Sequence, residues 1–68
     1  MAIIAVIGTG LIGTSMALAL KRAQIKNLEL VGTDRDSGAR AGAQKRGAFD
    51  RVEHRLSAAV QGADVVIL

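Results

Sequence analysis

Apolar residues change their spacing several times along the chain, and each change predicts a new element. Residues 3–7 form an unbroken aliphatic run that is closed by Gly8 and lacks the alternation of a half-exposed strand. Such a run predicts a strand buried on both faces, as in a parallel sheet that helices cover. Residues 11–23 are rich in good helix formers and carry Lys21 and Arg22 in their last turn, where cations suit the helix dipole. A first helix is therefore predicted there.

A second strand and helix follow the same order. Residues 28–33 predict a strand that ends at Asp34. Asp36 or Ser37 is expected to cap the next helix, and Gly47 is a natural residue just beyond its end.

The remaining third of the chain repeats the alternation with shorter elements. The second helix would contain Gly38 and Gly42, each of which costs about 1 kcal/mol relative to Ala. Residues 49–53 predict a third strand, residues 57–61 one or two helical turns, and residues 63–68 a fourth buried strand. The order β-α-β-α-β-α-β predicts an α/β fold of Rossmann type, with parallel strands, right-handed crossovers and helices on both faces of the sheet.

Composition indicates the type of core and the cellular compartment to expect for this fold. Half of the 68 residues are hydrophobic and Phe49 is the only aromatic, so the core is expected to be aliphatic. The chain has no cysteine, which fits a reducing compartment, and we expect a cytoplasmic protein. Residues 1–68 are expected to be the amino-terminal part of a larger protein, because Leu68 falls inside a predicted strand and one half of a doubly wound sheet would be missing.

Charge and hydropathy argue against a nucleic-acid partner and against a membrane. The net charge is +3, but the basic residues form no run and no aromatics lie between them, so nucleic-acid binding is not expected. Met1 stands directly before the first apolar run without a basic segment, which argues against a signal peptide. The apolar stretches are shorter than the roughly 20 residues that span a bilayer, so no membrane association is expected.

A glycine-rich turn carries the candidate chemistry. It follows a predicted buried strand, opens a predicted helix, and precedes an acidic residue by about 20 positions, which is the dinucleotide-binding fingerprint. Its residues are Gly8, Thr9, Gly10, Leu11, Ile12 and Gly13.

Each glycine of the turn has an expected task. Gly8 permits the tight turn, Gly10 lets a pyrophosphate approach the backbone, and Gly13 lets the helix pack close to the sheet, so that a Cβ at any of them would obstruct. The unpaired N–H groups at the helix start supply the anion site. Hydroxyls of Thr9, Thr14 and Ser15 are further candidate donors. The alternative is an ordinary glycine turn before a helix.

Asp34 is the acidic residue of the fingerprint. At the end of the second strand it is placed to accept hydrogen bonds from the adenosine ribose, which favours NAD as cofactor. Arg35 beside it could instead meet the 2′-phosphate of NADP or stack on the adenine, so NADP stays open. Asp34 could also be only a turn or capping residue.

Other polar residues give no catalytic or metal site. His54, the only histidine, lies in a charged stretch that is expected at a strand end away from the nicotinamide, and a surface position is the favoured interpretation. Asp64 is expected at the polar start of the last strand. No metal-ligand spacing, nucleophile elbow or pair of catalytic carboxylates is found, so no catalytic residue is assigned.

Three segments resemble the beginning of prephenate and arogenate dehydrogenases: residues 6–15, residues 31–36 and residues 47–50. This resemblance implies a whole enzyme that oxidatively decarboxylates prephenate or arogenate in tyrosine biosynthesis and passes hydride to the nicotinamide. It also implies a catalytic histidine, substrate-binding arginines and a helical domain that forms a homodimer, all beyond the matching region. The cofactor contacts that carry over by position are Gly8, Thr9, Gly10, Leu11, Ile12, Gly13, Asp34 and Arg35.

Two other functions remain open at the level of sequence. One is an NADP-dependent reductase or hydroxyacid dehydrogenase of related fold, since these enzymes share the glycine turn. The other is a non-catalytic module that senses a nucleotide and controls an interaction with another chain. We also expect self-association through the unpaired edge of the last strand.

Overall fold

The computed structural model describes residues 2–68, in which four strands alternate with three helices. The elements are β1 (Ala2–Ile7), α1 (Leu11–Arg22), β2 (Leu28–Thr33), α2 (Ser37–Lys45), β3 (Arg51–Glu53), α3 (Leu56–Val60) and β4 (Val65–Ile67). Every predicted element is present, with ends displaced by at most a few residues. The prediction of a Rossmann-type α/β fold is confirmed.

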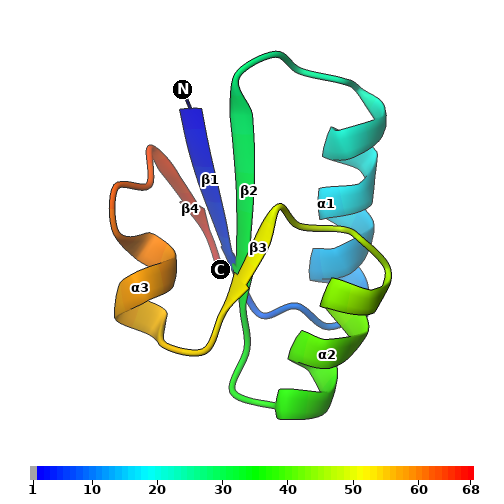
Figure 1. Ribbon diagram of the computed structural model, residues 1–68, viewed down its shortest axis with the longest axis vertical. Coiled ribbons are helices and arrows are strands. Elements are labelled where there is room, and N and C mark those ends of the chain that lie inside the picture. The colour runs from blue at the N-terminus through cyan, green and yellow to red at the C-terminus, as the bar shows by residue number, and fades with distance from the viewer. Residues whose placement is uncertain (1) are drawn as a thin grey trace.

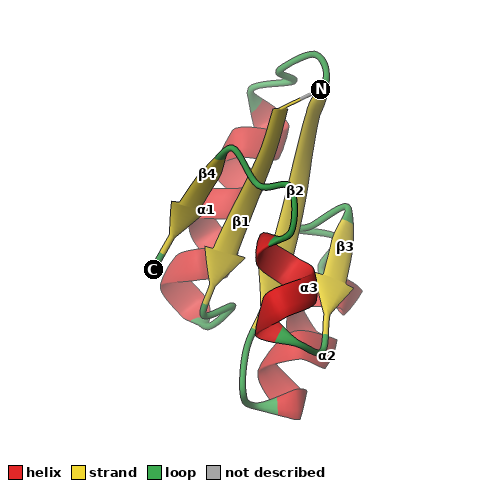
Figure 2. Cartoon of the chain, turned by 90° about the vertical axis from the view of Figure 1, so that its left-hand side faces the viewer, coloured by secondary structure: helices red, strands yellow, loops and turns green. Residues whose placement is uncertain are grey.

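The strands form one parallel sheet in the order β3-β2-β1-β4. Helices α1 and α2 lie on one face of the sheet, and α3 lies on the other (Figure 1). Figure 2 shows that all four strands run in the same direction, so that their carboxyl ends gather at one edge of the sheet. The strand order reverses between β1 and β4, and in such sheets the crevice at this reversal is where ligands bind.

The core lies between the sheet and helices α1 and α2. Its buried members are Val6, Ala17, Leu30, Ala43, Ala48 and Phe49. The single aromatic ring therefore completes an otherwise aliphatic core. Because α1 and α2 contribute small alanines to it, both helices approach the sheet closely.

Aspartates hold the two short strands in place. Asp50 donates its N–H to the carbonyl of Leu30 at 2.8 Å and accepts the Leu30 N–H on Oδ2 at 2.7 Å. Asp64 makes the same pair of contacts with Ile3, both at 2.8 Å. Each carboxylate thus extends the ladder by one hydrogen bond before β3 or β4 begins. The expected position of Asp64 at a strand start is confirmed, but its pairing with Ile3 was not predicted.

Helix α2 begins and ends as predicted. Of the two candidate caps, Asp36 is the N-cap, because its carboxylate accepts the Ala39 N–H at 3.0 Å. Gly47, just beyond the helix, has a φ of +67°, which a side chain disfavours.

The prediction that the fourth strand is buried is wrong. Val65 is 50% exposed and Val66 is 44% exposed, because β4 pairs with β1 on one side only among the described residues. Within residues 2–68, no helix has the length and hydropathy needed to cross a bilayer.

Candidate functional site

The glycine-rich turn connects the end of β1 to the start of α1, as predicted. Gly8 has a φ of +100°, a conformation that favours glycine, and its N–H donates to the carbonyl of Thr33 at 2.8 Å. A Cβ on Gly13 would lie 2.1 Å from the carbonyl oxygen of Gly8. The first turn of α1 therefore rests directly on the end of β1, and the close-packing role expected for Gly13 is confirmed.

Gly10 differs from the other two glycines of the motif. No atom of the chain lies within 4 Å of a Cβ built on Gly10, and its φ of −63° is open to any residue. Of the three glycines, only Gly13 would clash with the chain if it carried a Cβ. A Cβ on Gly8 also meets nothing within 4 Å, and there the positive φ is what disfavours a side chain. The expected approach of a pyrophosphate to Gly10 stays a prediction. What a Cβ on Gly10 would fill is open space in front of the helix start.

The start of α1 leaves its backbone donors free. Gly10 supplies no side-chain cap, and the first turn contains no acidic residue. The first hydrogen bond of the helix runs from the Thr14 N–H to the carbonyl of Gly10 at 2.9 Å, so the N–H groups of Leu11, Ile12 and Gly13 have no helical acceptor. Free donors at the positive end of a helix dipole attract an anion.

The threonine hydroxyls near the turn point inward. Thr14 donates its hydroxyl to the carbonyl of Thr9 at 2.6 Å, and the Oγ1 atom of Thr9 is buried without a partner. Each threonine is 3% exposed. Both hydroxyls are therefore buried, and that of Thr14 is already donated to the backbone, so their expected role as donors to a ligand stays a prediction. Ser15 is exposed on α1.

Asp34 connects the end of β2 to the glycine-rich turn. Its Oδ2 atom accepts the Thr9 N–H at 2.8 Å, and its Oδ1 atom accepts the Asp36 N–H at 2.9 Å. The bond from Asp36 lowers the pKa of Asp34 most; burial opposes it, and the Thr9 bond and the nearby charge of Arg40 lower the pKa further. Asp34 is thus an ionised carboxylate that lies directly beside the glycine-rich turn.

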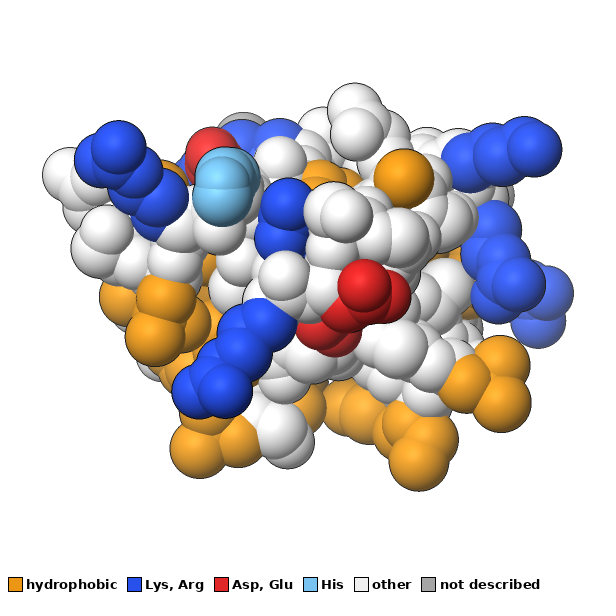
Figure 3. All heavy atoms as spheres, turned by 90° about the horizontal axis from the view of Figure 1, so that it is seen from below, with side chains coloured by type: hydrophobic (Ala, Val, Ile, Leu, Met, Phe, Trp, Pro, Cys, Tyr) orange, Lys and Arg blue, Asp and Glu red, His pale blue; other side chains and the backbone are white. Residues whose placement is uncertain are grey.

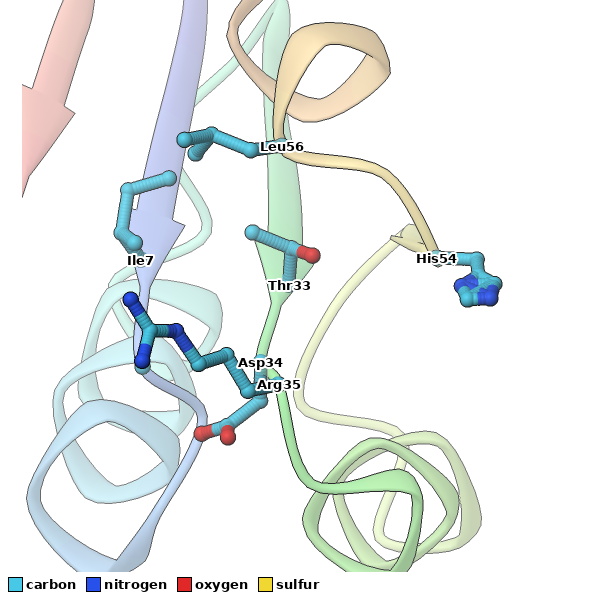
Figure 4. A pocket seen from close by; sticks show the side chains of 7 residues that line it. Ile7, Thr33, Asp34, Arg35, His54 and Leu56 are labelled. Carbon is cyan, nitrogen blue, oxygen red and sulfur yellow. The ribbon is translucent and has the colours of Figure 1, made fainter.

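A cavity of about 400 Å³ opens on the β2 side of the turn. It is lined by Ile7, Gly8, Thr33, Asp34, Arg35, His54 and Leu56. In Figure 4 the Arg35 side chain reaches across toward the end of β1, and the carboxylate of Asp34 lies below it. Leu56 extends toward Ile7, whereas the His54 ring points away from both charged groups (Figure 4). The cavity therefore joins an apolar wall to a carboxylate and a guanidinium.

A second cavity, of about 230 Å³, lies on the β4 side of the turn. It shares Ile7 and Gly8 with the first and is otherwise lined mainly by apolar residues, among them Ile12, Met16, Ile67 and Leu68. Figure 3 shows the molecule from the side where the strands end: charged side chains occupy the middle of this face, and hydrophobic ones gather along one border. The two hollows thus share Ile7 and Gly8, and the second one also reaches Ile12 and Gly13 at the start of α1.

Sequence analysis identified the turn, Asp34 and Arg35, and the structure brings all of them to one edge of the sheet. It missed Ile7, Leu56 and Arg40. Leu56 carried a usable signal, since it is a large apolar residue directly before a predicted helix; in the structure it is 57% exposed. Arg40 carried none, because its role depends on the path of the backbone before α2.

Fold and site together define a dinucleotide-binding domain of Rossmann type. The chain belongs to the family described as NADP oxidoreductase coenzyme F420-dependent, which matches residues 3–68. It is also 46% identical over 66 residues to the prephenate dehydrogenase of Lactococcus lactis subsp. cremoris (strain MG1363). That match covers 96% of this chain, and the chain spans 18% of the length of the relative. The chain thus has a dinucleotide-binding fold, belongs to an oxidoreductase family and is similar to part of a prephenate dehydrogenase.

Proposed function

We propose that this chain binds NAD and forms the cofactor-binding part of a dehydrogenase that oxidatively decarboxylates prephenate or arogenate. The observation that carries the proposal is that two cavities share Gly8, and that the second of them also reaches Ile12 and Gly13 at the uncapped start of α1. A dinucleotide consists of two nucleosides joined by a pyrophosphate, and this arrangement offers one hollow to each nucleoside and a cluster of donors to the charged centre.

The β2-side cavity fits the adenosine half. The Asp34 carboxylate accepts the ribose hydroxyls, while Ile7 and Leu56 cover one face of the adenine and the guanidinium of Arg35 stacks on it. The apolar β4-side cavity then receives the nicotinamide half, where Ile12 and Ile67 exclude water. Bound NAD supplies a hydride acceptor; the described residues bind and orient it.

The start of α1 holds the pyrophosphate. The free N–H groups of Leu11 and Ile12 donate to its oxygens, and the side-chain-free Gly10 lets it approach the backbone. Thr9 contributes through its backbone, which fixes Asp34, and Gly13 through its close contact with Gly8.

NAD is the proposed cofactor because of the charge on Asp34. Its carboxylate is ionised at neutral pH, since its pKa lies below the ordinary value of 3.8, and a 2′-phosphate beside it would be repelled. The competing proposal is NADP, which Arg35 in the same cavity and the description of the family favour. Calorimetric titration of the chain with NAD, NADP and ADP-ribose decides between them: we expect NAD and ADP-ribose to bind more tightly than NADP. Binding of none of the three would overturn the proposal.

The substrate is proposed from the Lactococcus relative. Because the chain spans 18% of that enzyme, catalysis, a cytoplasmic location and a homodimer would be properties of a whole protein. A chimera tests this step: residues 3–68 replace the matching segment of the relative, and NAD reduction is followed with prephenate and with arogenate. We expect prephenate-dependent NAD reduction. A chimera that folds and binds NAD, yet oxidises neither compound, would contradict the substrate proposal and leave the cofactor proposal standing.

A further inference from the structure

We propose that Arg40, on α2, is a positioning residue for the adenosine half of the dinucleotide, because its guanidinium fixes the backbone that carries Asp34. This inference rests on the proposed function. Nη1 of Arg40 donates to the carbonyl of Asp34 at 2.6 Å and to the carbonyl of Arg35 at 3.3 Å. One side chain thus holds the two successive peptide units that present both charged groups of the cavity.

The contacts of Arg40 fix the direction in which Asp34 points. The Arg40 guanidinium holds the Asp34 carbonyl, while the N–H groups of Thr9 and Asp36 hold its carboxylate at 2.8 and 2.9 Å. Hydrogen bonds therefore hold both the backbone and the side chain of Asp34 in place. Without Arg40, the backbone carbonyl loses its charged donor and the segment between β2 and α2 gains freedom to turn.

The place of Arg40 on its helix makes this role geometrically specific. Arg40 lies in the first turns of α2, where its own backbone N–H donates to the carbonyl of Asp36 at 3.1 Å. Asp36 also caps the helix through Ala39. These hydrogen bonds hold the start of α2 in place, and the Arg40 side chain extends from there back to the end of β2. The side chain is half-buried, which limits the competition from water.

The test compares Arg40→Met with Arg40→Lys and with a control, Arg22→Met, in the last turn of α1. Hydrogen bonds to charged groups are worth enough to expect a roughly tenfold loss of NAD and ADP-ribose affinity in Arg40→Met. The ratio of NAD to NADP affinity should fall toward one in the same variant. A displaced carboxylate would neither accept hydrogen bonds from the ribose nor repel the 2′-phosphate. Arg22→Met should keep the wild-type affinities and ratio.

The pH dependence separates positioning from a general loss of stability. Arg40→Met removes a positive charge near Asp34, which should raise the pKa of this carboxyl. The pH below which NAD affinity falls should therefore be higher in this variant. Arg40→Lys should keep the pH below which NAD binding weakens near its wild-type value, because the positive charge remains. It should recover only part of the affinity, since the lysine Nζ atom lies one bond closer to the backbone than the Nη1 atom that makes both contacts. If Arg40→Met fails to fold, Arg40→Lys still tests the inference through its reduced affinity.

The outcomes also distinguish this inference from the proposed function. If the wild-type chain binds no dinucleotide, the proposed function fails first. If the wild type binds NAD and the Arg40 variants bind it with the same affinity, only the role of Arg40 is overturned. The role is equally overturned if Arg40→Met lowers the melting temperature but leaves the NAD to NADP ratio unchanged.

Discussion

The Oδ2 atom of Asp34 accepts the backbone N–H of Thr9 at 2.8 Å, which ties the end of β2 to the glycine-rich turn after β1. The two residues are 25 positions apart in the sequence. Because the parallel strands are in register, with Ile7 beside Thr33, the turn and the carboxylate necessarily meet at one edge of the sheet. This relationship places the proposed anion site and the proposed ribose site side by side.

Asp34 should contribute to stability in a pH-dependent way. Its pKa in the folded chain is below the ordinary value of 3.8, so the unfolded chain binds this proton more tightly. The contribution to the free energy of unfolding is present above the ordinary value and is lost as the pH falls through the lowered pKa. Urea unfolding between pH 6 and about pH 2 should therefore show a shallower acid decline in Asp34→Asn than in the wild type. Identical acid declines would contradict this role.

The charge of Asp34 should also set the cofactor preference. In Asp34→Asn the repulsion of a 2′-phosphate disappears while Arg35 remains, so the ratio of NADP to NAD affinity should rise by at least about tenfold. Titration calorimetry measures both affinities. Asp50→Asn is the matched control: Asp50 pairs with Leu30 at the start of β3, so its loss should affect stability and leave the ratio unchanged. An equal change of the ratio in both variants would contradict the assignment.

Gly13 should be intolerant of any side chain. In Gly13→Ala the new Cβ would lie 2.1 Å from the backbone oxygen of Gly8, so the backbone must shift, and we expect a loss of about 3 kcal/mol or more in unfolding free energy. Gly42→Ala is the control within a helix, because nothing lies within 4 Å of its Cβ. It should stabilise the chain by about 1 kcal/mol through helix propensity. Denaturant unfolding of both variants tests the pair, and equal effects would contradict the account of the turn.

The edge of β4 should promote self-association of the 68-residue chain. Val65 and Val66 are about half exposed, and the outer backbone groups of β4 are unpaired among the described residues. Val66→Lys should reduce association, because a charged residue on an edge strand opposes pairing with another strand. Sedimentation velocity over a range of concentrations measures this. A wild-type chain that stays monomeric at every concentration would refute the prediction.

Local patterns were sufficient to predict the fold. The change from the aliphatic run before Gly8 to a helical period after Leu11 is recorded in consecutive residues, and the same holds for the strand that ends at Thr33. Parallel order followed from the alternation of strands and helices. The exposure of Val65 and Val66 could not be predicted, because burial of a strand depends on which neighbours it has in the sheet.

The site was predictable only where a short motif encodes it. The glycines and Asp34 have a characteristic spacing, whereas the inward direction of the Thr9 and Thr14 hydroxyls depends on packing beneath the turn. The contacts of Asp50, Asp64 and Arg40 join segments that come together only through strand register and the path of the backbone. Such contacts produce no periodic pattern of residue types in the sequence.

Gly10→Ala gives the most direct test of the central claim that the turn exists to admit a dinucleotide. Because no atom of the chain lies within 4 Å of the added Cβ and the backbone tolerates it, the free energy of unfolding should stay within about 0.5 kcal/mol of the wild type. Calorimetric titration should show that the wild type binds NAD and that the folded Gly10→Ala variant has lost at least about tenfold in affinity, since the methyl group occupies the space of the pyrophosphate. A folded Gly10→Ala variant with wild-type NAD affinity would contradict the account.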